Sequence, residues 1–161
     1  MLPTKNARAT RPCDPCPKKS TFMKFWYIRD VMPATEANER LIEHYGRLNY
    51  ARKKFPSLSS PGYDARGRIY IQYGPLDEEV VDTMPGGADP FETWAYYKFG
   101  APVTFDFVRK GLTYRLALDV DEGIKFTKRP LACIETLYER VLRRASLSPA
   151  YSTVFMELTN I

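Results

Sequence analysis

The apolar and polar residues between positions 36 and 55 repeat with the period of a helix. Leu41, Tyr45 and Leu48 fall on one side when the segment is helical. Thr35 stands where an N-cap is expected, and acidic residues at the start and basic residues at the end follow the order that the helix dipole favours. The pattern predicts a helix over about 36–55.

After residue 67 the apolar period changes to two. Ile69 and Ile71 alternate with polar residues, which predicts an interior strand over 68–73 with both isoleucines on its buried face. Lys110 and Gly111 separate two later apolar segments and predict a tight hairpin. The further predicted strands cover residues 93–99, 103–108 and 112–120.

The remaining segments give weaker patterns. Residues 77–92 carry six acids and no base, which predicts a long surface loop. Pro130 is expected to open a second amphipathic helix, and residues 151–158 are expected to form a short last strand. The apolar cluster at residues 22–32 is interpreted as a strand or short turn that anchors the arm to the core. The apolar stripe of the second helix comprises Leu131, Ile134, Leu137, Tyr138, Val141, Leu142 and Ala145.

These elements predict an α+β fold, in which an antiparallel sheet of about four strands packs with two amphipathic helices. Residues 1–21 contain four prolines and few large apolar residues, so we expect an extended arm that orders only on a partner. Residues 22–161 are expected to form a single domain, which ends in the helix and short strand of residues 130–161.

The length of 161 residues fits one domain, and the net charge of +5 changes the picture little. Five Lys or Arg residues and one Asp give the first 22 residues a charge of +4, which leaves +1 for the rest. Nucleic-acid binding by the folded part is therefore not expected. Lys24 and Arg29 interrupt the most apolar stretch, so no membrane span is expected, and no secretory signal is visible.

Three groups of motifs, in this order and spacing, resemble the GWxTD domain family over residues 22–120. The first motif is a cluster of aromatic residues followed by an Arg-Asp pair. The second is a Gly-rich segment that leads into a Gly-Pro-x-Asp-Glu turn, and the third is a strand with the pattern Glu-x-Trp. The residues of these motifs are Trp26, Arg29, Asp30, Gly62, Tyr63, Asp64, Gly67, Arg68, Tyr70, Gly74, Pro75, Asp77, Glu92 and Trp94.

The chain departs from the family pattern at several of its positions. Tyr63 stands where the signature has Trp, and Asp64 is the only candidate for the signature Asp in a shortened loop. Val31 and Leu76 replace two prolines of the pattern. The resemblance implies a bacterial protein of the cell envelope or exterior, belonging to a family without an assigned activity. Because no signal is visible, a cytoplasmic location stays open.

Cys13 and Cys16 have the C-x-x-C spacing of a metal pair, a local disulfide or two free thiols, and these alternatives stay open. A tetrahedral zinc site needs further ligands, but the other Cys is Cys133 and the single His is His44. Cys133 is interpreted as a core residue and His44 as solvated. No metal, cofactor or catalytic residue is therefore assigned.

One function is preferred, and two alternatives remain. The preferred function is a non-enzymatic assembly module that docks onto protein subunits. It would use its arm and some aromatic residues of the predicted sheet that are exposed. The alternatives are a glycan-binding domain and a hydrolase that uses two carboxylates, chosen among Asp64, Asp77, Glu92 and Asp106. The charged residues of these motifs are expected to pair with each other and fix the fold; otherwise they face a ligand. They are Arg29, Asp30, Arg66, Arg68, Asp77 and Glu78.

Overall fold

The computed structural model of the chain describes residues 17–83, 89–120, 122 and 133–159. The chain divides into two compact units, Met1–Tyr45 and Gly46–Ile161. The described residues contain five helices and one four-stranded antiparallel sheet, so the predicted α+β class is confirmed. Cys13, Cys16 and most of the predicted arm lie outside the described residues.

The first unit contains helix α1 (Pro17–Ile28) and the beginning of helix α2 (Glu39–Lys54), which continues into the second unit. The strand or turn predicted for residues 22–32 is wrong, and so is the extended arm for residues 17–21. Proline suits the first position of a helix, and no Gly or Pro interrupts the segment from Lys18 to Ile28.

Helix α2 confirms the predicted helix but begins later than expected. Asn38, rather than Thr35, caps it, because the Asn38 Oδ1 atom accepts a hydrogen bond of 2.8 Å from the backbone N–H of Leu41. Thr35 instead donates its hydroxyl hydrogen to Glu39 at 2.7 Å. The same hydrogen bond is the main reason why the pKa of Glu39 is lowered.

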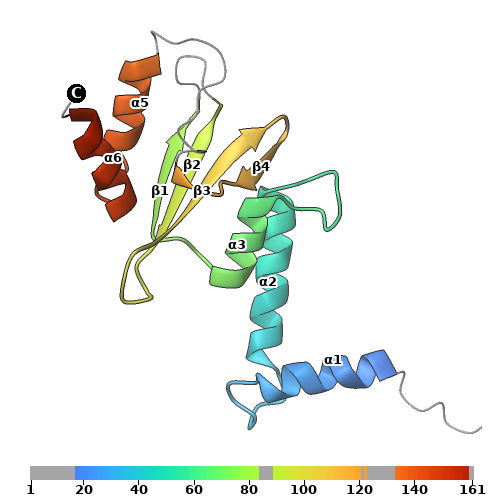
Figure 1. Cartoon of the computed structure of the whole chain (residues 1–161). Coiled ribbons are helices and arrows are strands. Elements are labelled where there is room, and N and C mark those ends of the chain that lie inside the picture. Colours follow the sequence, from blue (N-terminus) through green and yellow to red (C-terminus); the bar gives the residue numbers. More distant parts are fainter. Residues whose placement is uncertain (1–16, 84–88, 121, 123–132, 160–161) are drawn as a thin grey trace, which may run out of the picture. The chain divides into compact units, whose positions relative to one another are not determined.

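The sheet of the second unit is an antiparallel meander in the order β1-β2-β3-β4 (Figure 1). The three later strands confirm the predictions, and a two-residue turn at Gly111, whose φ is +65°, joins β3 to β4. The strand β1 lies inside the segment predicted to be a loop, so that prediction is wrong. The strands are β1 (Glu78–Asp82), β2 (Phe91–Tyr96), β3 (Val103–Lys110) and β4 (Thr113–Leu116).

Residues 68–73 are helical, so the interior strand predicted there is wrong. They belong to helix α3 (Ala65–Tyr73), which Asp64 caps at its start and Gly74 follows with a positive φ of +81°. Ile69 is buried and Ile71 only partly buried. An alternation over the five residues 68–72 is too short to distinguish a strand from a helix that shows one face to the core.

Two further helices complete the second unit, α5 (Cys133–Leu142) and α6 (Pro149–Thr159). The first confirms the predicted second amphipathic helix, although its expected start at Pro130 lies outside the described residues. The second replaces the strand predicted for residues 151–158, which is wrong. Ser148 accepts a hydrogen bond from the backbone of Ala150 and precedes Pro149, an arrangement that starts a helix.

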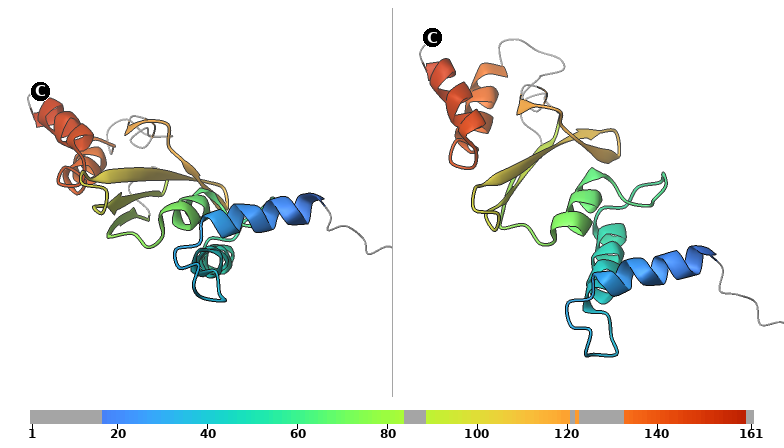
Figure 2. Two further views of the ribbon diagram at one scale, coloured as in Figure 1. Left: turned by 90° about the horizontal axis from the view of Figure 1, so that it is seen from below. Right: turned by 60° about the horizontal axis from the view of Figure 1, so that its bottom comes forward.

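Helices cover both faces of the sheet, as Figures 1 and 2 show for α3 on one face and α5 and α6 on the other. Trp94 and Phe107 pack with Phe55 and Ile69 on the α3 face. The opposite face is filled by a second apolar cluster. Every residue of β2 is consequently buried. The second cluster is built on Phe91, Val108, Val141 and Tyr151.

A buried ionic network fixes the α5–α6 segment to the sheet. The Asp82 carboxylate lies 2.7 Å from Arg144, 3.1 Å from Arg143 and 3.2 Å from Arg140. Arg144 also donates from Nε to the hydroxyl of Thr93 at 2.6 Å. Three arginines around one aspartate explain why an acidic segment, which alone reads as a loop, is held as strand β1.

Candidate functional sites

The residues of the Gly-rich motif converge at the start of α3. Asp64 accepts hydrogen bonds from the backbone N–H groups of Arg66 (2.9 Å) and Gly67 (3.4 Å), which makes it the N-cap. Its other oxygen accepts from the side chain of Arg66 at 2.8 Å and from the backbone N–H of Tyr114 at 3.3 Å. Asp64 therefore joins the first turn of α3 to strand β4.

Arg66 links two motif carboxylates that are far apart in the sequence. It donates to Glu92 at 3.0 Å as well as to Asp64, and its guanidinium lies 3.7 Å from the ring centroid of Tyr114. Burial by itself would lower the pKa of Arg66, but the hydrogen bonds and charges of the two carboxylates outweigh it and raise the pKa. Arg66 therefore stays charged, and its role is to hold the motif together.

Glu92 is buried on the α3 face, where it also accepts a hydrogen bond from the indole N–H of Trp94. Burial and the nearby Glu79 raise the pKa of Glu92, although Arg66 and Trp94 oppose the shift. The motif residues Asp64, Glu92 and Trp94 are thus brought together, with Arg66 between the two acids. Their contacts are with each other and with the core.

Two glycines of the motif allow neighbouring side chains to approach the backbone closely. A Cβ at Gly67 would lie 2.8 Å from the Cβ of Tyr63, and one at Gly74 would lie 2.9 Å from the guanidinium carbon of Arg47. The carbonyl of Gly74 accepts a hydrogen bond from Tyr96 at 3.1 Å. These contacts explain both glycines as packing requirements.

The other motif residues do not join this cluster. Tyr70 stacks on Tyr50 with ring centroids 4.4 Å apart, while Gly62, with φ +90°, turns the chain before Asp64. Pro75 is exposed, and Asp77 accepts a hydrogen bond from the backbone N–H of Tyr97. Arg68 and Asp77 form no ion pair with each other in the part of the chain that the structure describes, so their expected pairing is wrong.

The carboxylates considered for a hydrolase do not form a pair with access to solvent. Asp64 and Glu92 are buried and neutralised by Arg66. Asp106 lies on the opposite face of the sheet, where it accepts a hydrogen bond from Thr93 at 2.7 Å. Burial raises the pKa of Asp106 against the opposing effects of Thr93, Tyr151 and Arg144. These positions give no support to two carboxylates acting on one substrate.

In the first unit, Trp26 is the motif residue that contacts the start of α2. Its ring centroid lies 5.1 Å from that of His44, and its carbonyl accepts a hydrogen bond of 2.7 Å from Asn38. Arg29 donates to the carbonyl of Phe25, and Asp30 accepts from the backbone N–H of Met32. His44 is therefore partly covered, which differs from the solvated residue expected.

The other apolar residues of this segment are exposed, and we call them the α1 surface. Tyr27 is 74% exposed and Ile28 is 68% exposed. Contiguous exposed apolar residues of this size mark interaction sites. The sequence contained the signal, a run of consecutive aromatic and aliphatic residues, but we interpreted it as an anchor to the core. The α1 surface comprises Phe22, Met23, Phe25, Tyr27, Ile28, Val31 and Met32.

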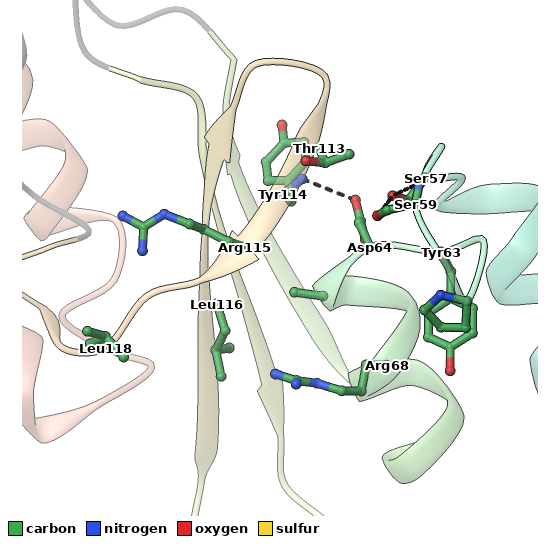
Figure 3. Close-up of a pocket in the computed structure, with 12 residues that line it drawn as sticks. Ser57, Ser59, Tyr63, Asp64, Arg68, Thr113, Tyr114, Arg115, Leu116 and Leu118 are labelled. Carbon is green, nitrogen blue, oxygen red and sulfur yellow. Dashed lines mark hydrogen bonds between the residues drawn. The ribbon is translucent and has the colours of Figure 1, made fainter.

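A second surface is a groove of about 610 Å³ in the second unit, between the loop that precedes α3 and strand β4 (Figure 3). Arg68 extends along it toward Leu116, and three aliphatic hydroxyl groups lie on its walls. These aliphatic hydroxyl groups belong to Ser57, Ser59 and Thr113, and Tyr63 and Tyr114 add phenol groups. From the sequence, Arg68 was named only as part of a motif, and no groove was predicted beside it.

Comparisons with known proteins found no matching family model, no matching curated protein and no matching solved structure. The resemblance to the GWxTD family therefore stays a prediction. Within the described residues, no helix is long and apolar enough to cross a membrane. The same residues contain no group of three or more His, Cys, Asp or Glu side chains that could hold a metal ion.

Proposed function

We propose that the chain is a non-enzymatic interaction module that docks onto a protein subunit of a larger assembly through the α1 surface. The observation that supports this proposal most directly is the exposure of Tyr27 and Ile28 together with their apolar neighbours. Exposed aromatic residues are typical anchors of protein interfaces, since they bury a large area for a small loss of conformational entropy.

The distribution of apolar residues around α1 favours a protein groove over a membrane surface. Successive helical residues are about 100° apart, so Phe25, Trp26, Tyr27 and Ile28 cannot lie on one side of the helix. A helix that lies on a membrane separates a polar face from an apolar face. A helix that is apolar on most sides is better matched by a partner that surrounds it.

The charge of α1 indicates what kind of protein the partner is. Lys19, Lys24 and Arg29 are exposed, and residues 17–29 contain no acid. Two copies of α1 packed together would place these cations against each other. We therefore propose an acidic partner rather than a second copy, and the N-terminal 16 residues, which are also basic, would add to the attraction. An envelope or extracellular location of this assembly follows from the family resemblance alone.

The test begins with a photo-crosslinking residue at position 27 in cells and, as a control, at position 112, where Leu112 is 82% exposed. A protein crosslinked only from position 27 would be identified, purified and titrated against the full chain. We expect the double change Tyr27→Ser and Ile28→Ser to weaken its binding at least about ten-fold, the size typical of interface anchors.

The matched control is Leu58→Ser with Leu112→Ser, because both leucines are exposed and lie outside the α1 surface. This control should change the affinity less than about two-fold, within the range of neutral interface contacts. Equal effects of the two variants would contradict the proposal. Two further results would contradict it. One is self-association of the chain in sedimentation equilibrium that the α1 variant abolishes, and the other is binding to anionic vesicles that the same variant abolishes.

A further inference from the structure

The outer edge of β4 carries backbone groups that the sheet does not use. β4 is the last strand in the order β1-β2-β3-β4, so one of its edges faces no other strand. The N–H of Tyr114 points away from β3, because it donates to Asp64, while the N–H of Ala117 donates to Asp106 of β3. Since the direction alternates along a strand, the N–H and C=O of Leu116 also point away from β3.

The register of the sheet supports this assignment. Tyr114 is opposite Arg109, whose N–H donates to the carbonyl of Pro90 on the β2 side at 2.9 Å rather than to β4. Tyr114 and Leu116 are therefore the residues whose backbone groups do not pair with β3. Asp64 already satisfies the N–H of Tyr114, which leaves the C=O of Tyr114 and both groups of Leu116 at the edge.

These backbone groups lie at the groove of Figure 3, which Tyr114 and Leu116 help to line. The opposite wall comes from the loop before α3 and from Arg68 of α3. The groove therefore combines an open strand edge with a cation and hydroxyl groups. A peptide backbone can pair with the edge, and the opposite wall can then contact its side chains.

The charges at the groove indicate which side chains fit. Arg68 is exposed, and its side chain forms no ion pair or hydrogen bond with the residues that the structure describes. Arg115, the other cation of the lining, is paired with Glu122. The only acid of the lining, Asp64, is already paired with Arg66. Arg68 is therefore placed to bind a carboxylate, with two parallel hydrogen bonds available from its guanidinium.

We propose that this groove binds an extended acidic peptide, which adds to the edge of β4 at Leu116 and places an Asp or Glu side chain against Arg68. The N–H and C=O of Leu116 pair with one residue of the peptide, and the hydroxyl groups of the opposite wall hydrogen-bond to its polar atoms. This interface is separate from the α1 surface and does not depend on the function proposed above.

The test uses heptapeptides selected from a random phage-displayed library on the full chain, followed by synthesis of the selected sequences. We expect enrichment of Asp or Glu, a fall in affinity with added salt, and slower amide hydrogen exchange at Leu116, by at least about ten-fold, when the peptide is bound. In the free protein, the amide of Leu116 should exchange faster than that of Arg115, which faces β3.

Arg68→Glu should weaken the binding of the selected acidic peptide at least about ten-fold, because it replaces an attraction between charges by a repulsion. The matched control is Lys53→Glu, which makes the same change of charge at an exposed position of α2 outside the groove. The double change Tyr27→Ser and Ile28→Ser should leave peptide binding unchanged, which separates this test from the test of the α1 surface.

Several outcomes would overturn the proposal. One is that no heptapeptide binds above its scrambled version. Another is that inorganic phosphate or acetate binds at Arg68 with the affinity of the peptide, which would indicate a site for small anions. A third is that the peptide leaves the exchange of Leu116 unchanged, because strand addition requires that amide.

Discussion

Helix α1 and strand β2 are both rich in aromatic residues, but the two elements differ in how far these side chains are buried. Trp94 and Tyr96 of β2 are completely buried, whereas Phe25 and Tyr27 of α1 are exposed. In β2 the two faces of the sheet each meet a helical layer, so every side chain is covered. In α1 the contacts of Trp26 with Asn38 and His44 leave the neighbouring aromatics uncovered.

This difference in burial indicates which aromatic residues stabilise the fold and which are available for binding a partner. Burial of an aromatic side chain stabilises the fold by up to a few kcal/mol, and that contribution is present in β2. An exposed aromatic has not yet lost its contact with water, so its burial remains available to a partner. We therefore expect changes in β2 to act on folding, and changes in α1 to act on association.

Trp94→Ala tests the buried side of the comparison and should have the largest effect. Trp94 packs against Phe55 and Phe107, with ring centroids 5.4 and 5.0 Å apart. Removing the indole leaves a cavity and should lower the free energy of unfolding by about 3–5 kcal/mol. Urea denaturation followed by circular dichroism measures the loss. A loss under about 1 kcal/mol would mean that β2 is not the centre of the core.

Asp82→Ala tests whether the second face of β2 depends on the ionic network. The change leaves Arg140 and Arg144, both buried, without their carboxylate and should cost about 3–5 kcal/mol. The control is Asp89→Ala, which removes a more exposed pair with Lys110 and should cost less than about 1 kcal/mol. Similar urea midpoints for the two variants would show that the network does not hold α5 and α6.

Glu92→Gln tests the buried carboxylate of β2 through its dependence on pH. The folded state raises the pKa of Glu92 above its unfolded value of about 4.3, so the folded state holds this proton more tightly. Its ionisation therefore lowers stability as the pH rises from about 4.3 through the folded pKa.

We expect the Glu92→Gln variant to lose less stability than the natural chain over this pH range. Urea midpoints measured at successive pH values show the difference between the two chains. The control is Glu157→Gln, which changes an exposed carboxylate of α6 and should leave the pH profile unchanged. A steeper loss in the Glu92→Gln variant would reverse the direction assigned to Glu92.

Tyr27→Ser with Ile28→Ser tests the exposed side of the comparison and should have the smallest effect on folding. Neither side chain is buried, so each change should alter the free energy of unfolding by no more than about 0.5 kcal/mol. Thermal melting of the free chain provides the measurement. A loss comparable to that of Trp94→Ala would place α1 in the core of the monomer and remove the basis for docking through it.

Local patterns predicted the elements that carry their own start and stop signals. The helix at residues 36–55 has a clear apolar face, and the hairpin of β3 and β4 has Gly111 at its turn. Comparable signals were present for α3, with Asp64 before it and Gly74 after it, and for α6, with Ser148 and Pro149. Both helices were nevertheless predicted as strands, α3 because its period-two pattern was given more weight than these caps.

The candidate sites were predictable only in part. The motif residues Asp64, Glu92 and Trp94 do meet, but the sequence did not predict that Arg66 would pair with Asp64 and Glu92. Arg68 was selected, but the groove beside it forms only when the loop before α3 lies next to β4. The spacing along the chain contains no information about that approach.

The sequence by itself determined the α+β class, three of the four strands, the helix that becomes α2 and the amphipathic helix that becomes α5, because each depends on periodicity and turn residues within a short segment. Tertiary structure alone decided that β1 is a strand, that both faces of β2 are buried and that the edge of β4 opens into a groove. Strand β1 needs the carboxylate of Asp82 to meet arginines more than fifty residues away. Such contacts depend on which surfaces meet when the chain folds, and a local pattern cannot specify them.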